Sequence, residues 1–240
     1  MRCKPEFVAA MIEDMHWFGL EWQEGPDCDG AFGPYNQSER REYYVNAFEK
    51  LQAGGFIYPC RCSRRDVARA LGAPQGAEDE PIYPGTCRPK PGGTGHDTES
   101  EPKSADLTIG SWRFRVSDGQ VVSFVDGHFG QQQFEAGKDF GDFVVWRRDA
   151  GPSYQLSVVV DDSAMQITEV VRGADLLLST ARQILIYRAL NLPIPAFYHC
   201  SLITDDSGAR LAKRHDALSL RELRAQGFTP GNLRARAQLT

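Results

Sequence analysis

The sequence predicts an α/β protein with a parallel sheet in its second half, and two patterns support this fold class. From about residue 139 onward, short apolar runs that suit strands alternate with helical periodicity. Such alternation is typical of a parallel sheet whose helices connect successive strands. Between residues 106 and 147, apolar and polar residues alternate with the period of half-buried strands. A chain of 240 residues can bury a substantial core and hold one or two domains.

Two amphipathic helices are expected within the first 55 residues. Pro5 suits a first helical position, and apolar residues recur at helical spacing after it as far as Gly19, which can end the helix. A second helix should run from Ser38, a plausible N-cap, to Gly54. Its inward face would carry Tyr44, Phe48 and Leu51.

The β-rich region reads as a hairpin. Trp112, Phe114 and Val116 alternate with polar residues on one strand, and Val122 and Phe124 do so on the next. Residues 117–120 connect the two strands with a sequence typical of a hairpin turn. We therefore expect these two strands to pair with each other.

Residues 139–195 contain two expected strands, one run of undecided type and one helix. Residues 142–148 and 167–172 carry the short apolar runs of strands. The apolar run within residues 153–162 is too short to distinguish a buried strand from a buried helix. A helix should follow, with Ser179 or Thr180 as its N-cap and Pro193 beyond its end.

Composition is that of an ordinary globular protein, with 41% hydrophobic and 25% charged residues. The net charge of −5 does not mark a nucleic-acid binder, so any RNA contact would need a local basic face, best supplied by the arginines between Arg210 and Arg236. No apolar run is long enough to span a membrane, and the N-terminus has no apolar signal core. Six cysteines without a secretion signal favour a reducing cytoplasm.

Three of the cysteines have the spacing of a metal site. Cys60 and Cys62 lie too close in sequence to favour a mutual disulfide, but both sulfurs can reach one ion together with Cys87. The fourth ligand is open on spacing alone, and His96 is one candidate. The alternative is three free thiols. Isolated positions make a buried or bystander thiol the better interpretation of the remaining cysteines, Cys3, Cys28 and Cys200.

The stretch from residue 201 to residue 224 combines a basic loop with a helix start. A short apolar strand at residues 202–203 and a turn precede the cations Arg210 and Lys213. Ser219 and Glu222 then have the spacing of a capping box. Cations beside a helix start suit a nucleotide phosphate chain, whereas spacing alone favours a solvated basic loop.

Arg172 lies at the end of an expected strand, at the edge where ligands of parallel sheets bind. An arginine there can hold a carboxylate through two parallel hydrogen bonds, but a surface ion pair is at least as good an interpretation. For Tyr154, residue type alone favours a core aromatic.

Several motifs together resemble the class I glutamyl-tRNA synthetase family, especially its shortened glutamyl-Q tRNA(Asp) branch. Residues 210–214, Arg-Leu-Ala-Lys-Arg, resemble the K-M-S-K-S loop, with Lys213 at the second lysine and Arg210 at the first. Residues 171–175, Val-Arg-Gly-Ala-Asp, are similar to the family's V-R-G-A-D element. The C-x-C pair followed by Tyr83 and Cys87 is similar to the branch's C-x-C and Y-x-x-x-C pattern.

This resemblance implies a Rossmann-type nucleotide-binding fold with an inserted zinc and β subdomain. Residues 1–58 would be the rest of the first nucleotide-binding half, residues 59–138 the insertion with a flexible loop at 73–104, and residues 139–240 the second half. The family's H-I-G-H-type motif does not occur. We therefore expect a chain that is truncated, completed by another polypeptide, or no longer a full enzyme.

The resemblance also implies a function, namely ATP-dependent activation of L-glutamate and its transfer to the queuosine base of tRNA(Asp). Magnesium would accompany ATP, and the chain would act as a monomer. The alternatives are a fragment of a synthetase that charges tRNA(Glu), or a non-catalytic zinc-bearing remnant that binds RNA or a partner. The implied site residues are Lys213 for catalysis, Arg210 and Lys213 for ATP, Tyr154 and Arg172 for glutamate, and Cys60, Cys62, Tyr83 and Cys87 for zinc.

Overall fold

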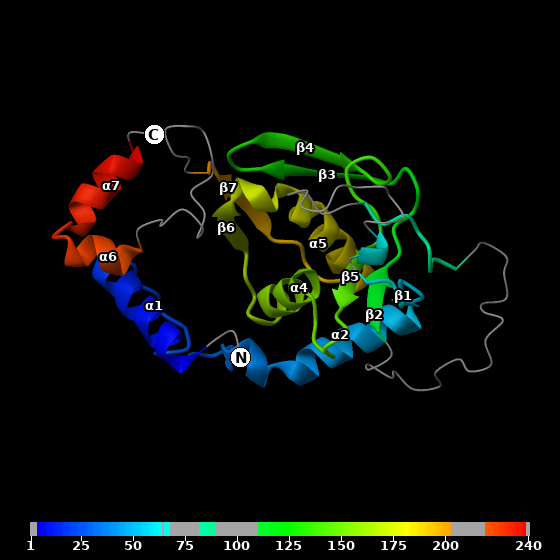
Figure 1. Ribbon diagram of the computed structural model, residues 1–240, viewed down its shortest axis with the longest axis horizontal. Helices are drawn as coiled ribbons and strands as arrows, with labels where there is room; N and C mark the ends of the chain where they lie inside the picture. Colours follow the sequence, from blue (N-terminus) through cyan, green and yellow to red (C-terminus); the bar gives the residue numbers. More distant parts are fainter. Residues whose placement is uncertain (1–3, 64, 68–81, 90–109, 203–218, 239–240) are drawn as a thin grey trace. The chain divides into compact units, whose positions relative to one another are not determined.

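The computed structural model describes residues 4–63, 65–67, 82–89, 110–202 and 219–238. The chain divides into two compact units (Figure 1). The larger unit comprises residues 37–200, and the smaller comprises residues 1–36 with residues 201–240. No described helix is long and apolar enough to cross a membrane.

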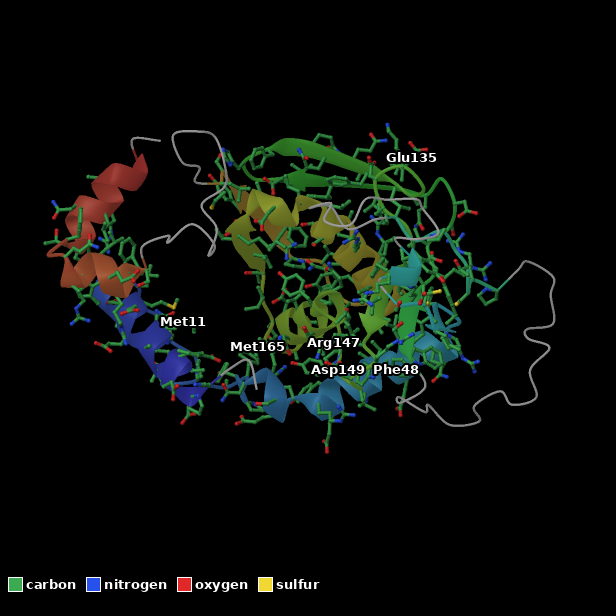
Figure 2. The ribbon with its side chains drawn as sticks, viewed as in Figure 1. Met11, Phe48, Glu135, Arg147, Asp149 and Met165 are labelled. Atoms are coloured by element: carbon green, nitrogen blue, oxygen red, sulfur yellow. The ribbon has the colours of Figure 1, made fainter. Side chains whose placement is uncertain are left out.

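The larger unit contains two sheets, of which the first is antiparallel. Its strand order is β1-β2-β5, with β2 pairing on both sides. The strands are β1 (Ile57–Cys60), β2 (Ser111–Phe114) and β5 (Phe143–Trp146). Phe48 packs against Trp112 of β2 and Trp146 of β5, with ring centroids 5.0 and 5.2 Å away, and is labelled in Figure 2.

The second sheet is mixed and has the order β4-β3-β7-β6. Its strands are β3 (Val121–Asp126), β4 (Gly130–Glu135), β6 (Glu169–Gly173) and β7 (Ala196–Cys200). Strands β3 and β4 are antiparallel, whereas β7 is parallel to both β3 and β6. The expected parallel pairing is therefore found on both sides of β7, and the antiparallel strand β4 makes the sheet mixed.

Helices complete the core of the larger unit. They are η1 (Gln37–Glu39), α2 (Arg41–Ala53), α4 (Tyr154–Ala164), η2 (Ala174–Leu176) and α5 (Leu177–Ala189). Helix α5 connects β6 to β7 and is buried from Ser179 to Tyr187 (Figure 1). As expected, α2 directs Tyr44, Phe48 and Leu51 into this core.

A buried carboxylate joins α2 to α4. Asp161 accepts hydrogen bonds from Arg40 Nε at 2.6 Å, from the Tyr44 hydroxyl at 2.9 Å and from Gln37 Nε2 at 2.9 Å. Arg40 is fully buried, so its charge requires a close anionic partner. This contact fixes the start of α2 against the middle of α4.

The smaller unit is helical in its described part. It contains α1 (Pro5–Phe18), α6 (Leu220–Ala225) and α7 (Pro230–Gln238). Gly19 ends α1 with a φ of 85°, a conformation that favours glycine. Both hydrogen bonds of the expected capping box at Ser219 are present. Arg221 and Arg224 of α6 pair with Glu13 of α1 at 2.9 and 3.0 Å.

The predicted hairpin is wrong. The turn exists, with Gln120 N donating to Ser117 O at 3.0 Å, but the strands on its two sides belong to different sheets. Strand β2 pairs with β1 and β5, whereas β3 pairs with β4. Alternation predicts a strand and its buried face but not its partner, which long-range contacts decide.

The tertiary structure also decided where two helices begin and which type of element the undecided run forms. The N-cap of α2 is Arg40 rather than Ser38, because η1 precedes the helix. Helix α5 begins at Leu177, so Ser179 and Thr180 lie inside it and are buried. The undecided run forms α4, for which Ser153 is the N-cap and accepts from Leu156 N. The apolar face expected on α1 contains no buried residue.

Candidate functional site

Arg172 lies at the carboxyl end of β6, beside parallel strand β7. It is opposite His199 in the register of the two strands, and η2 and α5 follow directly. In α/β sheets this edge is where ligands bind, because the turns that leave parallel strands open a crevice there. The β6–α5 connection thus presents the Arg172 side chain at the edge that the sequence predicts.

Four side chains hold the Arg172 guanidinium. Its Nη2 donates to Thr180 Oγ1 and to Gln183 Oε1, both at 2.7 Å. Its Nε donates to His199 Nε2 at 3.2 Å, and its Nη1 lies 3.5 Å from the hydroxyl of Tyr154. Gln183 is itself oriented by Gln155 of α4, whose Oε1 accepts from Gln183 Nε2 at 2.9 Å. The guanidinium is therefore held in one orientation by residues of α4, α5 and β7.

A buried aspartate supports the histidine. Asp126 Oδ2 lies 2.6 Å from His199 Nδ1, and both side chains are fully buried. Asp126 also accepts the backbone N–H groups of His128, Phe129 and His199. Burial alone would raise the pKa of Asp126, but these hydrogen bonds outweigh it and lower the pKa to about 2. Asp126 is accordingly an anion that orients His199.

Tyr154 is not the core aromatic that residue type favours. It is the first residue of α4 and is 46% exposed. It also lines a cavity of about 460 Å³ that includes the cations Arg41 and Arg147, of which Arg147 is labelled in Figure 2. Tyr154 and Arg172 thus lie side by side, with a hydroxyl next to a cation.

The three cysteines converge, as their spacing indicates. The Sγ atoms of Cys60, Cys62 and Cys87 all lie within 4.8 Å of one another. The Tyr83 hydroxyl is 3.5 Å from Cys60 Sγ and 3.6 Å from Cys62 Sγ. Arg113 stacks on the Tyr83 ring at 3.9 Å and donates to Cys60 Sγ at 3.4 Å. Four donor atoms therefore surround one point, while His96 lies outside the described residues.

This donor set fits a tetrahedral metal ion. Metal–sulfur bonds of about 2.3 Å in a tetrahedron separate neighbouring sulfurs by roughly 3.8 Å. The Cys62 and Cys87 sulfurs are 3.5 Å apart, so a small adjustment would suffice. Burial opposes ionisation of Cys87, but hydrogen bonds led by that of Tyr83 outweigh it and lower the thiol pKa to about 7. The ligand form of cysteine is the thiolate, so the lowered pKa suits Cys87 to metal binding. Burial raises the pKa of the Cys62 thiol and of the Tyr83 hydroxyl, so these two donors would lose their protons only to a bound metal ion.

Asp142 anchors the segment that carries Tyr83 and Cys87. It accepts from Arg88 Nε and Nη2 at 2.8 and 2.6 Å, from the Tyr58 hydroxyl at 2.5 Å and from Val116 N at 2.8 Å. Because Arg88 directly follows Cys87, one buried carboxylate ties the cysteine loop to the antiparallel sheet. The hydrogen bonds of Asp142 support the site without any metal.

The sequence did not predict several residues that surround Arg172. Two residues that it did predict, for ATP, lie outside the part of the chain that the structure describes. His199, Thr180, Gln183 and Asp126 were not predicted. The only local signal was His199 on the inward face of β7, beside buried Phe197. The predicted ATP residues Arg210 and Lys213 lie outside the described residues.

An α/β fold with an arginine held at a strand end is consistent with a nucleotide-dependent ligase. The family model described as "tRNA synthetases class I (E and Q), catalytic domain" matches residues 1–238. The chain belongs to this family of aminoacyl-tRNA synthetases.

The chain is similar to individual relatives of two kinds. The chain is 48% identical to a glutamyl-Q tRNA(Asp) synthetase of Symbiobacterium thermophilum, over 95% of the chain and 69% of that protein. It is 42% identical to one of Nitratidesulfovibrio vulgaris, over 97% of the chain and 70% of that protein. It is 43% identical to glutamate–tRNA ligase 2 of Nitrosococcus oceani, over 95% of the chain but only 47% of the ligase.

Solved structures support the fold. The crystal structure of a glutamate-tRNA synthetase from Elizabethkingia anophelis matches with a TM-score of 0.71 at 24% identity. The match covers 95% of this chain and 45% of that synthetase. The chain thus spans about half the length of the glutamate–tRNA ligases that it matches.

Proposed function

We propose that this chain activates L-glutamate with ATP and transfers it to the queuosine base of tRNA(Asp). The observation that carries the proposal is the Arg172 guanidinium, held beside the Tyr154 hydroxyl at a strand end, 3.5 Å away. A cation and a hydroxyl in one place suit a carboxylate of the amino acid. The division of the chain near residues 58 and 138 belongs to the same proposal.

The chemistry requires little acid–base help from the protein. The substrate carboxylate attacks the α-phosphate of ATP, and the rate depends on positioning and on stabilising the phosphate charge. In this proposal Arg172 and Tyr154 position glutamate. Arg210 and Lys213 contribute positive charge to the phosphates, and magnesium accompanies ATP.

Replacing Lys213 with alanine should lower glutamate-dependent ATP–pyrophosphate exchange by about 10²-fold or more, because a charge on the transition-state phosphates is lost. Lys138→Ala, at an exposed lysine of the larger unit, is the matched control and should leave exchange unchanged. An unaltered rate in Lys213→Ala would remove this lysine from the mechanism.

The transfer step distinguishes the two closest functions. Glutamyl-Q tRNA(Asp) synthetases and a glutamate–tRNA ligase both share more than 40% identity with this chain, so a charging assay must identify the acceptor tRNA. We expect the chain to charge tRNA(Asp) that carries queuosine, and neither queuosine-free tRNA(Asp) nor tRNA(Glu). Charging of tRNA(Glu) instead would support a glutamate–tRNA ligase. Equal charging of both forms of tRNA(Asp) would contradict the queuosine assignment.

We also propose that the cysteine site holds zinc, with Cys60, Cys62, Tyr83 and Cys87 as ligands. Such an ion would have a structural role, since four protein donors leave no open position for substrate. It would join the turn after β1 to the segment at residues 82–89.

Metal analysis of protein purified under reducing conditions should give about one zinc per chain. Cys87→Ser should lower this content several-fold, because a weakly acidic hydroxyl replaces a thiolate donor. Cys28→Ser, at an exposed and isolated cysteine, should leave the content unchanged. Much less than one zinc in the unoxidised parent protein would contradict the proposal.

A further inference from the structure

The hydrogen bonds of Arg172 leave one nitrogen for a ligand. Each terminal nitrogen of a guanidinium carries two protons and Nε carries one. The Nε proton goes to His199, and both Nη2 protons go to Thr180 and Gln183. Within the described part of the chain, Nη1 has only the long contact to the Tyr154 hydroxyl. Nη1 is therefore the nitrogen with protons to spare.

The protonation of His199 follows from its neighbours. Arginine only donates, so His199 Nε2 must accept the Arg172 Nε proton at 3.2 Å and carries no proton itself. The ring proton then lies on Nδ1, where Asp126 Oδ2 accepts it at 2.6 Å. Three backbone N–H groups fix the Asp126 carboxylate in turn. Asp126 thus fixes the His199 ring, and His199 in turn fixes the direction in which Arg172 Nε donates its proton.

We propose that a substrate carboxylate meets Arg172 through Nη1 together with the Tyr154 hydroxyl, and that His199 is the positioning residue that enforces this geometry. The proposal rests on the proposed function in one respect, namely that the ligand is glutamate. It differs from the expected pair of parallel hydrogen bonds, because any such pair needs a proton of Nη2 or Nε, and those protons are already donated to protein side chains.

A consequence is that the ligand contact is shared between two residues from different elements. Arg172 of β6 supplies the charge, and Tyr154 of α4 supplies a hydroxyl proton. Among the described residues, the His199 side chain forms hydrogen bonds with Arg172, Thr180 and Asp126 and none with Tyr154, so in this proposal it acts on the ligand through Arg172. Its removal should alter ligand affinity without removing a ligand contact.

Calorimetric titration of the full chain with L-glutamate tests this arrangement. His199→Leu, which removes the acceptor of Arg172 Nε, should weaken binding by about tenfold or more. His199→Gln can present an amide oxygen at the same place and should restore most of the affinity. Tyr154→Phe should weaken binding by about tenfold if the hydroxyl shares the carboxylate. His128→Gln is the matched control, because the His128 ring contacts the carbonyl of His199 and the rings of Phe129 and Tyr198 but neither Arg172 nor Tyr154.

A second measurement does not depend on glutamate binding. Nitrogen-15 NMR of the ligand-free chain should show His199 protonated at Nδ1 only, with the Arg172 Nε proton protected from exchange. A His199 ring protonated at Nε2, or an unprotected Arg172 Nε proton, would overturn the positioning role. Because this measurement uses the parent chain, it applies even if His199→Leu fails to fold. Folded His199→Leu that binds glutamate as the parent does would overturn it as well.

The two proposals can fail separately. A parent chain that binds no glutamate, yet shows the expected His199 and Arg172 signals, contradicts the proposed substrate and leaves the geometry standing. Glutamate binding that is insensitive to Tyr154→Phe contradicts the shared contact and leaves the proposed substrate standing.

Discussion

Replacing Arg172 with alanine should lower glutamate-dependent ATP–pyrophosphate exchange by about 10²-fold or more. The change removes the cation proposed to hold the substrate carboxylate, and it leaves His199, Thr180 and Gln183 without the donor that they share. Truncating one partner of a desolvated charged contact typically weakens binding by 2–5 kcal/mol, which is roughly 30-fold to several thousand-fold.

Two further variants make this result specific. Arg172→Lys keeps the charge, but its single nitrogen lacks the planar fork that reaches His199, Thr180 and Gln183 and leaves Nη1 for the ligand. It should therefore recover only a small part of the lost exchange. Arg188→Ala, at an exposed arginine near the end of α5, should leave exchange unchanged. A folded Arg172→Ala protein with exchange close to that of the parent would remove Arg172 from the substrate site.

Replacing Asp142 with alanine should lower the free energy of unfolding by about 3–5 kcal/mol, because a buried partner of a charged group is lost. The Asp142 side chain is only 2% exposed, and Arg88, Tyr58 and Val116 all donate to it. Urea unfolding at equilibrium measures the change, provided that the slope with denaturant stays the same.

Asp118 supplies the control for this prediction. It also pairs with Arg88, but its side chain is 90% exposed, so Asp118→Ala should change stability by no more than about 1 kcal/mol. Asp142→Ala should in addition weaken zinc binding, because Arg88 no longer fixes the loop that carries Tyr83 and Cys87. Equal stability of the two variants would show that Asp142 is not the anchor of that loop.

The cysteine site shows which metal ligands can be predicted from their spacing in the sequence. Two cysteines separated by one residue must lie close together, so Cys60 and Cys62 could be assigned to one site from the sequence. The third sulfur and the Tyr83 hydroxyl come from a segment more than 20 residues away. The loop between them contains no pattern that fixes their distance, and only the resemblance to a family indicated Tyr83.

The arginine site was predicted only in part, for a related reason. Arg172 belongs to a short motif, and Tyr154 was named only through the resemblance to the family. His199 and Asp126 have no such motif, and 73 residues separate them. Their role depends on β3 and β6 lying on either side of β7, and nothing in their local sequence encodes that order.

The sequence by itself determined the features that depend on neighbours within one or two turns of chain. The inward face of α2, the αL residue Gly19 and the capping box at Ser219 are of this kind, because a helical period and a cap are set by residues three or four positions apart. Only the tertiary structure decided which strands pair, whether residues 153–162 form a helix, and which side chains orient Arg172. Those outcomes depend on contacts between distant segments, whose free energies become available only when the core has assembled.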